Sequence, residues 1–241
     1  NALQVKLPTI YAIGEYWHSD VNVLLGYLDK THFSCALFDV PLHYQFVRAS
    51  MSNGTFDMRS IFDHTLLQAA PEHAITFVDN HDTQPHQALQ SWVEAWFKPI
   101  AYALILLHPL STPCIFYGDF YGIPHDDIAC VEGLERLLMV RKLAAFGEVH
   151  EYLDDPTIIG WSQEGEDEGG YALLVSDGEG GEKEMFVGLK HVGEIYLDVL
   201  NHREEAVMID EEGKGRFFVR GGSVSVWLPR CVYERIVVET A

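Results

Sequence analysis

Two strand-like segments of the sequence each end in side chains that could do acid–base chemistry. Residues 74–78, Ala-Ile-Thr-Phe-Val, run directly into the cluster Asp-Asn-His-Asp at 79–82. Residues 9–14 form a second apolar run that ends at Glu15, and Trp17 follows two positions later. Short apolar runs of this kind are typical of buried strands. Parallel strands that end in acids and an imidazole bring those groups to one edge of a sheet, where (β/α) enzymes hold their active sites.

Glu15 and Asp82 together would form a pair of carboxylates. Such a pair suits cleavage of a glycosidic bond, because one acid can stay protonated while the other stays ionised. The flat ring of Trp17 would offer a face for a sugar to stack on. Each feature also has a structural explanation: Glu15 as a solvated strand-end acid, Trp17 as a core aromatic, and residues 79–82 as a turn that caps the next helix. The occurrence of two such strand ends favours the catalytic interpretation.

These segments resemble motifs of glycoside hydrolase family 13, the α-amylase family, and above all its liquefying bacterial and fungal intracellular members. Residues 77–82 match the motif that carries the transition-state-stabilising Asp, here Asp82, and a substrate-contacting His, here His81. Residues 14–17 match the motif of the general acid/base, here Glu15. Four further segments stand in the family's order and approximate spacing, at residues 38–44, 97–103, 116–119 and 221–226.

The resemblance implies retaining endo-hydrolysis of α-1,4-glucosidic bonds in starch- or glycogen-like glucans. Glu15 would protonate the glycosidic oxygen and then activate water. Asp82 would stay ionised and bind the sugar hydroxyls as the ring flattens, while His81 donates a hydrogen bond to the same sugar and Trp17 contacts the substrate. Two alternatives stay open: an α-glucanotransferase of the same family, and a non-catalytic carbohydrate-binding or scaffold relative. The presence of Glu15, His81 and Asp82 favours an enzymatic origin.

A retaining enzyme also needs a nucleophilic carboxylate, which in this family lies at the end of barrel strand four, before the general acid. No such motif precedes Glu15. Neither Asp79 nor Asp119 matches the family position, so we expect both to be structural or subsite residues. We therefore expect this chain to be a fragment that is inactive by itself.

The resemblance also implies calcium, although the family's principal site lies mainly in the part of the barrel that comes before these motifs. A second calcium in some relatives bridges the barrel and the C-terminal domain. The corresponding stretches here are Gly54–Phe56, His150–Glu151 and Glu166, with Glu151 and Glu166 at the carboxylate positions. Calcium prefers hard oxygen ligands, and the longer Glu side chain need not place them correctly. No HExxH-like pairing points to zinc.

Strand-like runs near residues 10, 36, 76 and 115 alternate with helical patterns at 20–29, 57–70, 91–107 and 132–146. Such alternation predicts a parallel α/β sheet. A (β/α)₈ barrel has eight such units, so the resemblance implies its second half, strands five to eight, in residues 1–150. Half a barrel would leave two unpaired edges and an open apolar interior. Short alternating runs and Gly-rich turns predict an antiparallel β-sandwich in residues 151–241.

The composition limits the partners. Thirty-six acids against 16 Lys and Arg give a net charge of −20, which argues against binding nucleic acid or an anionic membrane and is compatible with a neutral α-glucan. The longest apolar stretch, residues 100–107, is too short to span a bilayer. Four widely spaced cysteines do not form a secreted disulfide framework, which favours a cytoplasmic location, with secretion as the alternative. The oligomeric state is left open.

Overall fold

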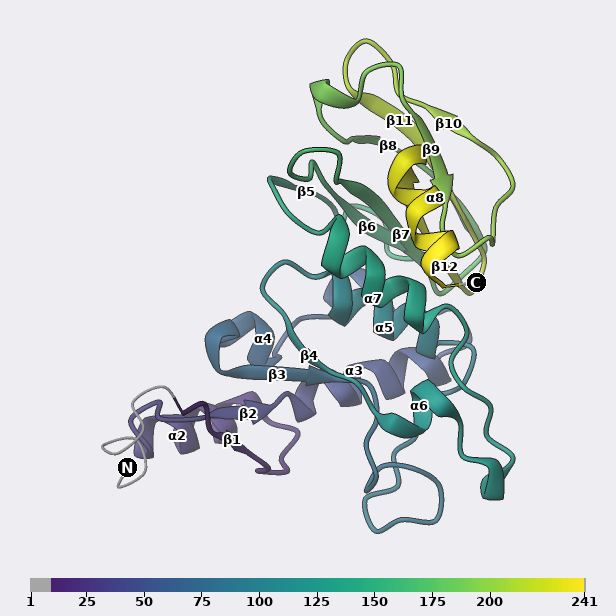
Figure 1. Cartoon of the computed structure of the whole chain (residues 1–241). Coiled ribbons are helices and arrows are strands. Elements are labelled where there is room, and N and C mark those ends of the chain that lie inside the picture. The colour runs from purple at the N-terminus through teal and green to yellow at the C-terminus, as the bar shows by residue number, and fades with distance from the viewer. Residues whose placement is uncertain (1–9, 241) are drawn as a thin grey trace.

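The computed structural model describes residues 10–240 and consists of two stacked parts (Figure 1). A four-stranded sheet with its helices forms the first part, and antiparallel strands with one terminal helix form the second. This arrangement confirms the predicted succession of a parallel α/β sheet and antiparallel sheets.

The first sheet has the order β1-β2-β3-β4, and every neighbouring pair is parallel. Its strands alternate with helices along the chain, as the sequence predicted. The strands are β1 (Ile13–Gly14), β2 (Ala36–Phe38), β3 (Ala74–Phe77) and β4 (Thr112–Cys114). The helices are α2 (Val21–Lys30), α3 (Val40–Met51), α4 (Leu66–Ala69), α5 (Lys98–Leu107), α6 (Tyr117–Tyr121) and α7 (Leu134–Leu143).

Two of the helix predictions were wrong. The single helix expected at 57–70 is a 3-10 turn at Met58–Ser60 followed by the short α4, because Asp57 and Thr65 each cap a separate turn. The helix expected from residue 91 begins only at Lys98. Pro99 lies in its first turn, where a missing N–H costs nothing.

Helix α3 was not predicted from the sequence. In the structure Asp39 is the N-cap of α3 and Pro41 lies in its first turn. Strand β1 is also shorter than expected, and position 9 of that predicted strand lies outside the described residues.

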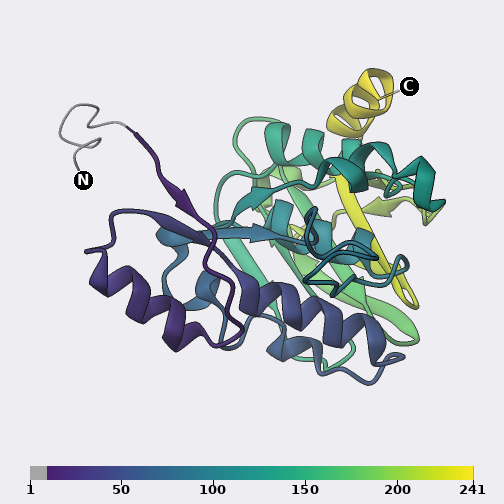
Figure 2. The ribbon, with the colours of Figure 1, turned by 90° about the horizontal axis from the view of Figure 1, so that it is seen from below.

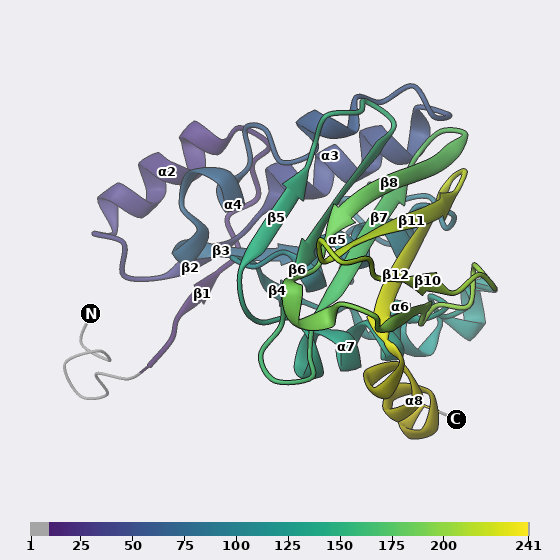
Figure 3. The ribbon, with the colours of Figure 1, turned by 90° about the horizontal axis from the view of Figure 1, so that it is seen from above.

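The second part is a six-stranded antiparallel sheet in the order β10-β9-β12-β7-β6-β5, with the two-stranded antiparallel sheet β11-β8 facing it (Figure 3). Helix α8 (Arg230–Glu239) closes the chain and was not predicted. The strands are β5 (Val149–Tyr152), β6 (Ile158–Gln163), β7 (Tyr171–Ser176), β8 (Gly180–Phe186), β9 (Ile195–Asp198), β10 (Val207–Met208), β11 (Lys214–Arg220) and β12 (Ser223–Pro229).

Strand β7 is buried on both faces and shows how the two parts pack together. Leu173 and Val175 belong to the large core that includes α5 and α7, whereas Ala172 and Leu174 belong to a smaller core inside the sandwich. Because successive side chains of a strand point to opposite faces, the large sheet serves both cores. The sequence of β7 is therefore a continuous run of apolar residues and does not alternate between apolar and polar.

Both edges of the parallel sheet are unpaired among the described residues, as expected for four strands of an open sheet. Figure 2 shows β1 at one side, leading away from the body, and the Ile13 side chain on it is 51% exposed. The expected open apolar interior is not seen at β3, where Ile75 and Phe77 are almost completely buried. Rings from Trp17 and His43 cover Phe77. No helix in the described part of the chain has the length and apolarity needed to cross a membrane.

Candidate active site

Strands β1 and β3 flank β2 and run in the same direction, so their carboxyl ends meet the same edge of the sheet. Glu15 follows β1 directly and is exposed to solvent. The cluster at residues 79–82 follows β3 after Val78. Two strand ends that are separated by one strand lie roughly 10 Å apart. The topology thus brings both predicted acids to one edge of the sheet.

Trp17 holds the end of β1 against the end of β3. Its indole Nε1 donates to the Tyr44 hydroxyl at 3.2 Å, and its ring lies with centroids 5.9 Å from Phe77 and 5.8 Å from His43. The residue is half-buried. This packing gives Trp17 a structural role. The residue stands two positions after Glu15, and part of its surface remains exposed.

His43 fixes the segment that leads into the cluster. Its Nδ1 donates to the Val78 carbonyl at 2.6 Å, and the Ser91 hydroxyl lies 2.8 Å from Nε2. The imidazole also stacks on Phe77 with planes only 9° apart. Burial lowers the pKa of His43 to about 4. The ring is therefore neutral at pH 7 and acts as a fixed support, a role that the sequence did not reveal.

An Asx turn presents His81 and Asp82. The Asn80 Oδ1 accepts from the backbone N–H groups of Asp82 and Thr83, each at 2.9 Å. His81 Nε2 lies 3.5 Å from Asp82 Oδ1, and the two side chains are 68% and 43% exposed. Both groups therefore stand beside each other and are accessible to a ligand. Across residues 10–240, no hydrogen bond or ion pair joins Glu15 to either of them.

Asp79 lies beneath this turn in a buried ion-pair cluster. The Lys98 Nζ lies 2.9 Å from Asp79 Oδ2 and 2.5 Å from Asp119 Oδ1, and the Tyr102 hydroxyl donates to Asp119 at 2.6 Å. Thr83 donates to Asp79 Oδ1 at 2.7 Å. Burial raises the pKa of Asp79 to about 7, while Lys98 opposes the rise.

The cluster gives a structural role to two further acids, Asp79 after β3 and Asp119 in α6. Both carboxylates of Asp79 and Asp119 are at most 1% exposed and are engaged by Lys98. Neither is free to attack a substrate. Their place in the fold is structural, because they join the segment after β3 and helix α6 to the start of α5.

The expected calcium ligands do not converge. Glu151 lies on β5 opposite Trp161, in the middle of β6, whereas Glu166 follows the C-terminal end of β6 in the loop to β7. The Gly54 loop is instead next to residues 177 and 178, since a Cβ on Gly54 would lie 2.8 Å from the Asp177 carbonyl oxygen. The Gly54 loop and Asp177 lie beside the start of β6, because the Asp177 N–H donates to the Thr157 carbonyl, whereas Glu166 follows the end of β6. The six residues of β6 separate them by roughly 20 Å. Glu166 therefore cannot share an ion with Gly54–Phe56.

Asp177 is the residue that the sequence analysis missed at this loop. It is only 4% exposed, and neither carboxylate oxygen has a hydrogen-bond partner in the described structure. Burial raises its pKa to about 6, against the lowering effect of the nearby Phe56 backbone. Its signal in the sequence is weak, because an Asp-Gly pair in a hairpin is an ordinary turn. No group of three or more His, Cys, Asp or Glu side chains within residues 10–240 is arranged to hold a metal.

Comparisons with known proteins agree with the fold. The chain is 50% identical over 225 residues to an α-amylase of Geobacillus stearothermophilus, which covers 92% of this chain and 41% of that protein. It is 40% identical over 237 residues to a cytoplasmic α-amylase of Escherichia coli, which covers 93% and 48%. A crystal structure of an Anoxybacillus α-amylase matches with a TM-score of 0.64 at 15% identity, over 95% of this chain and 54% of that one.

The chain thus spans about half the length of these relatives. No protein-family model matches it.

Proposed function

Because the chain is a relative of the α-amylases of glycoside hydrolase family 13, we propose that it supplies the acid/base half of an α-amylase-type active site. In this proposal residues 1–150 correspond to strands five to eight of a (β/α)₈ barrel and residues 151–241 to the C-terminal β domain. The substrate is an α-1,4-linked glucan, and the reaction is retaining endo-hydrolysis. The observation that carries the proposal is the placing of Glu15 and Asp82 after parallel strands at one sheet edge.

Glu15 acts as general acid and then as general base. Its exposure leaves the carboxyl accessible to a bound glycosidic oxygen. Asp82 stabilises the positive charge that develops on the sugar ring, and His81, 3.5 Å away, donates to the same sugar. Trp17 borders the site beside Glu15. Retaining chemistry further requires a nucleophilic carboxylate about 5–5.5 Å from the acid. Asp79 and Asp119 are committed to Lys98, so we expect the 241-residue chain alone not to hydrolyse starch.

A chimera tests the assignment of the acids. This chain would replace the aligned 225 residues of the Geobacillus stearothermophilus α-amylase, and release of reducing ends from soluble starch would be measured. We expect an active chimera in which Glu15→Gln lowers kcat by about 10²–10⁴-fold, the usual contribution of a general acid/base. Glu234→Gln, on α8, is the matched control and should leave kcat unchanged. An active chimera that tolerates Glu15→Gln would disprove the role of Glu15.

The same experiment distinguishes the reaction types. Product analysis with a maltooligosaccharide separates hydrolysis, which yields only shorter chains, from glucan transfer, which also yields longer ones. A folded chimera that binds starch without either reaction would favour the carbohydrate-binding alternative. Starch hydrolysis by the chain alone would contradict the expectation that it is inactive by itself.

We propose Asp177, and not Glu151 or Glu166, as the carboxylate ligand of a calcium ion. A buried carboxylate without hydrogen-bond partners fits a cation, and backbone carbonyls of the adjacent Gly54–Phe56 loop are hard oxygen donors of the kind calcium prefers. An ion held there would bind the α/β part to the sandwich. It would therefore serve stability and would take no part in the chemistry.

The cellular location is proposed on two grounds. All four cysteines are free thiols in the structure, as is usual in reducing compartments, and one relative is described as a cytoplasmic α-amylase. We propose a cytoplasmic location on this basis.

A further inference from the structure

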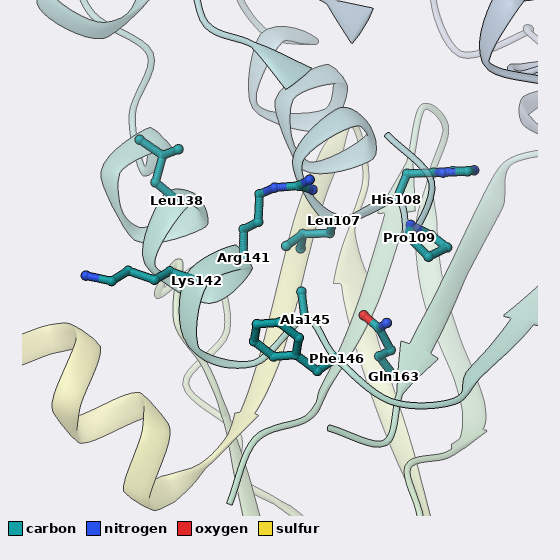
Figure 4. A pocket seen from close by; sticks show the side chains of 9 residues that line it. All are labelled: Leu107, His108, Pro109, Leu138, Arg141, Lys142, Ala145, Phe146 and Gln163. Carbon is teal, nitrogen blue, oxygen red and sulfur yellow. The ribbon is translucent and has the colours of Figure 1, made fainter. Parts of the chain in front are cut away.

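A cavity of about 500 Å³ lies at the opposite end of the parallel sheet from Glu15 and Asp82. It opens where α5 ends and the chain turns toward the start of β4, and α7 and the end of β6 form its other walls (Figure 4). Cavities of 300–1,000 Å³ are of the size that holds small ligands. The nine lining residues are Leu107, His108, Pro109, Leu138, Arg141, Lys142, Ala145, Phe146 and Gln163.

Gln163 provides an unused hydrogen-bond acceptor in this cavity. The side chain is only 5% exposed, and its Nε2 donates to the Gly147 carbonyl at 3.3 Å. Its Oε1 is buried and has no donor within the described residues. Buried acceptors are almost always satisfied, since an unpaired one costs free energy. Figure 4 shows the amide among the lining side chains, and rotation of the amide toward the cavity would let a ligand hydroxyl donate to Oε1.

The charge of the lining is opposite to that of the protein. Arg141 and Lys142 contribute two cations, and none of the nine residues is acidic, although the chain carries 36 acids against 16 Lys and Arg. The Arg141 guanidinium donates to the carbonyls of Leu106 and Ser111 and has no carboxylate partner within residues 10–240. Lys142 is exposed at the rim and forms no ion pair with the described residues. An uncompensated positive lining favours an anionic ligand.

Apolar side chains form the remaining wall. The Phe146 ring is 44% exposed beside Leu138 and Ala145. Such a partly exposed ring offers a flat surface to the C–H face of a sugar or polyol. His108 packs edge-on against Phe62 and Trp161 and belongs to the rigid floor of the cavity.

We propose that this cavity binds a small phosphorylated sugar: a sugar hydroxyl donates to Gln163 Oε1, Arg141 and Lys142 attract the phosphate, and Phe146 packs on the ring. This site is separate from the proposed glycosidase site and does not depend on it. Because the cavity lies against both α5 and β6, an occupant would contact both parts of the molecule.

Isothermal titration of the chain with glucose 6-phosphate tests the proposal without any measurement of hydrolysis. We expect saturable binding that weakens with added salt, and affinities about tenfold or more lower for glucose and for inorganic phosphate, because each offers only half of the contacts. Absence of saturation up to about 10 mM glucose 6-phosphate would overturn the proposal. Equal binding of glucose would show a neutral saccharide site, and equal binding of phosphate a simple anion site; either result also overturns it.

Variants locate the binding. Gln163→Met removes the free acceptor, and Lys142→Met removes the rim cation; each should weaken glucose 6-phosphate binding about tenfold. Lys30→Met on α2 is the matched control and should bind normally. If Gln163→Met does not fold, as judged by circular dichroism, Lys142→Met and Phe146→Ala still test the location of the site, because both side chains are exposed. Unchanged affinity in these variants would place the ligand elsewhere.

Discussion

At the scale of single residues, acids in this chain have different roles according to how deeply they are buried. Glu15 and Asp82 remain accessible to a ligand, whereas Asp79 and Asp119 share one lysine inside the protein. A buried carboxylate needs a partner because desolvation penalises its charged form. Proximity to a strand end is therefore not sufficient to identify a catalytic acid in this fold.

Lys98→Met provides the first test at this scale. The substitution leaves Asp79 and Asp119 buried 2.9 and 2.5 Å from where their cation had been. Removing one partner of a buried ion pair typically costs about 3–5 kcal/mol, and we expect that loss in urea unfolding. Lys214→Met removes an exposed ion pair with Glu212 and should change the free energy of unfolding by less than about 1 kcal/mol. Equal effects of the two substitutions would contradict the role of the buried cluster.

Asp177 provides a second test, by calcium and pH. With about ten times its Kd of calcium, a single site adds about 1.4 kcal/mol, or a rise in Tm of about 3–5 °C for a chain of this size. Asp177→Asn should abolish the rise, whereas Glu151→Gln and Glu166→Gln should keep it. The reverse pattern would restore the ligands expected from the sequence.

The pH dependence follows from the sign of the pKa shift. The pKa of Asp177 is about 6 in the folded protein, above its usual 3.8. Between these pH values the folded, metal-free protein binds more protons than the unfolded chain, so its free energy of unfolding falls as the pH rises through about 6. Calcium needs the ionised carboxylate. The calcium-induced rise in Tm should therefore be present at pH 7 and disappear near pH 5.

At the scale of elements, one side chain organises two helices. The Asp39 carboxylate accepts from the backbone N–H of Leu42 in α3 and from those of Leu66 and Leu67 in α4, at 2.7–3.1 Å. It is completely buried, and burial raises its pKa to about 6. A single acid thus ends β2, begins α3 and holds the start of α4.

Asp39→Ala should therefore cost more than the loss of an ordinary helix cap. Three buried N–H groups lose their acceptor, and we expect about 2–4 kcal/mol from the cap and the unsatisfied donors together. Asp20→Ala removes the exposed cap of α2, where the side chain accepts from one backbone N–H, and should cost about 1 kcal/mol. Chemical unfolding of both variants measures the difference, and similar losses would show that Asp39 is an ordinary cap.

At the scale of the whole molecule, the α/β part and the sandwich share one core. The Tyr171 hydroxyl on β7 donates to the Leu107 carbonyl at the end of α5 at 2.7 Å, and the Trp161 indole donates to the same carbonyl at 3.1 Å. The large core includes residues of α5, α7, β6, β7 and β12. The two parts should therefore unfold as one cooperative unit.

Coincident unfolding curves from helical circular dichroism and from tryptophan fluorescence would confirm a single transition. Tyr171→Phe should shift both curves equally, by about 1–2 kcal/mol. Tyr233→Phe removes a hydroxyl that donates to the exposed Asn201 side chain and should shift neither curve. Two separate transitions would show that the sandwich folds independently.

The sequence by itself determined the alternation of strands and helices, the change to antiparallel strands near residue 150, and the acids at the ends of β1 and β3. These features depend on local patterns, because apolar runs, helix caps and turns each involve residues that are close together in the sequence. The prediction of one helix at 57–70 failed for the same reason, because its apolar spacing fits a helix while Asp57 and Thr65 bond to their own backbone instead.

Only the tertiary structure decided which acids are paired and which are accessible. Lys98 is 19 residues from Asp79 and 21 from Asp119 in the sequence, and no local pattern indicates that the three meet. The same holds for Asp177, which meets the Gly54 loop from more than 120 positions away. Burial and ion pairing depend on which distant segments pack together, and that packing sets the protonation and the role of each carboxylate.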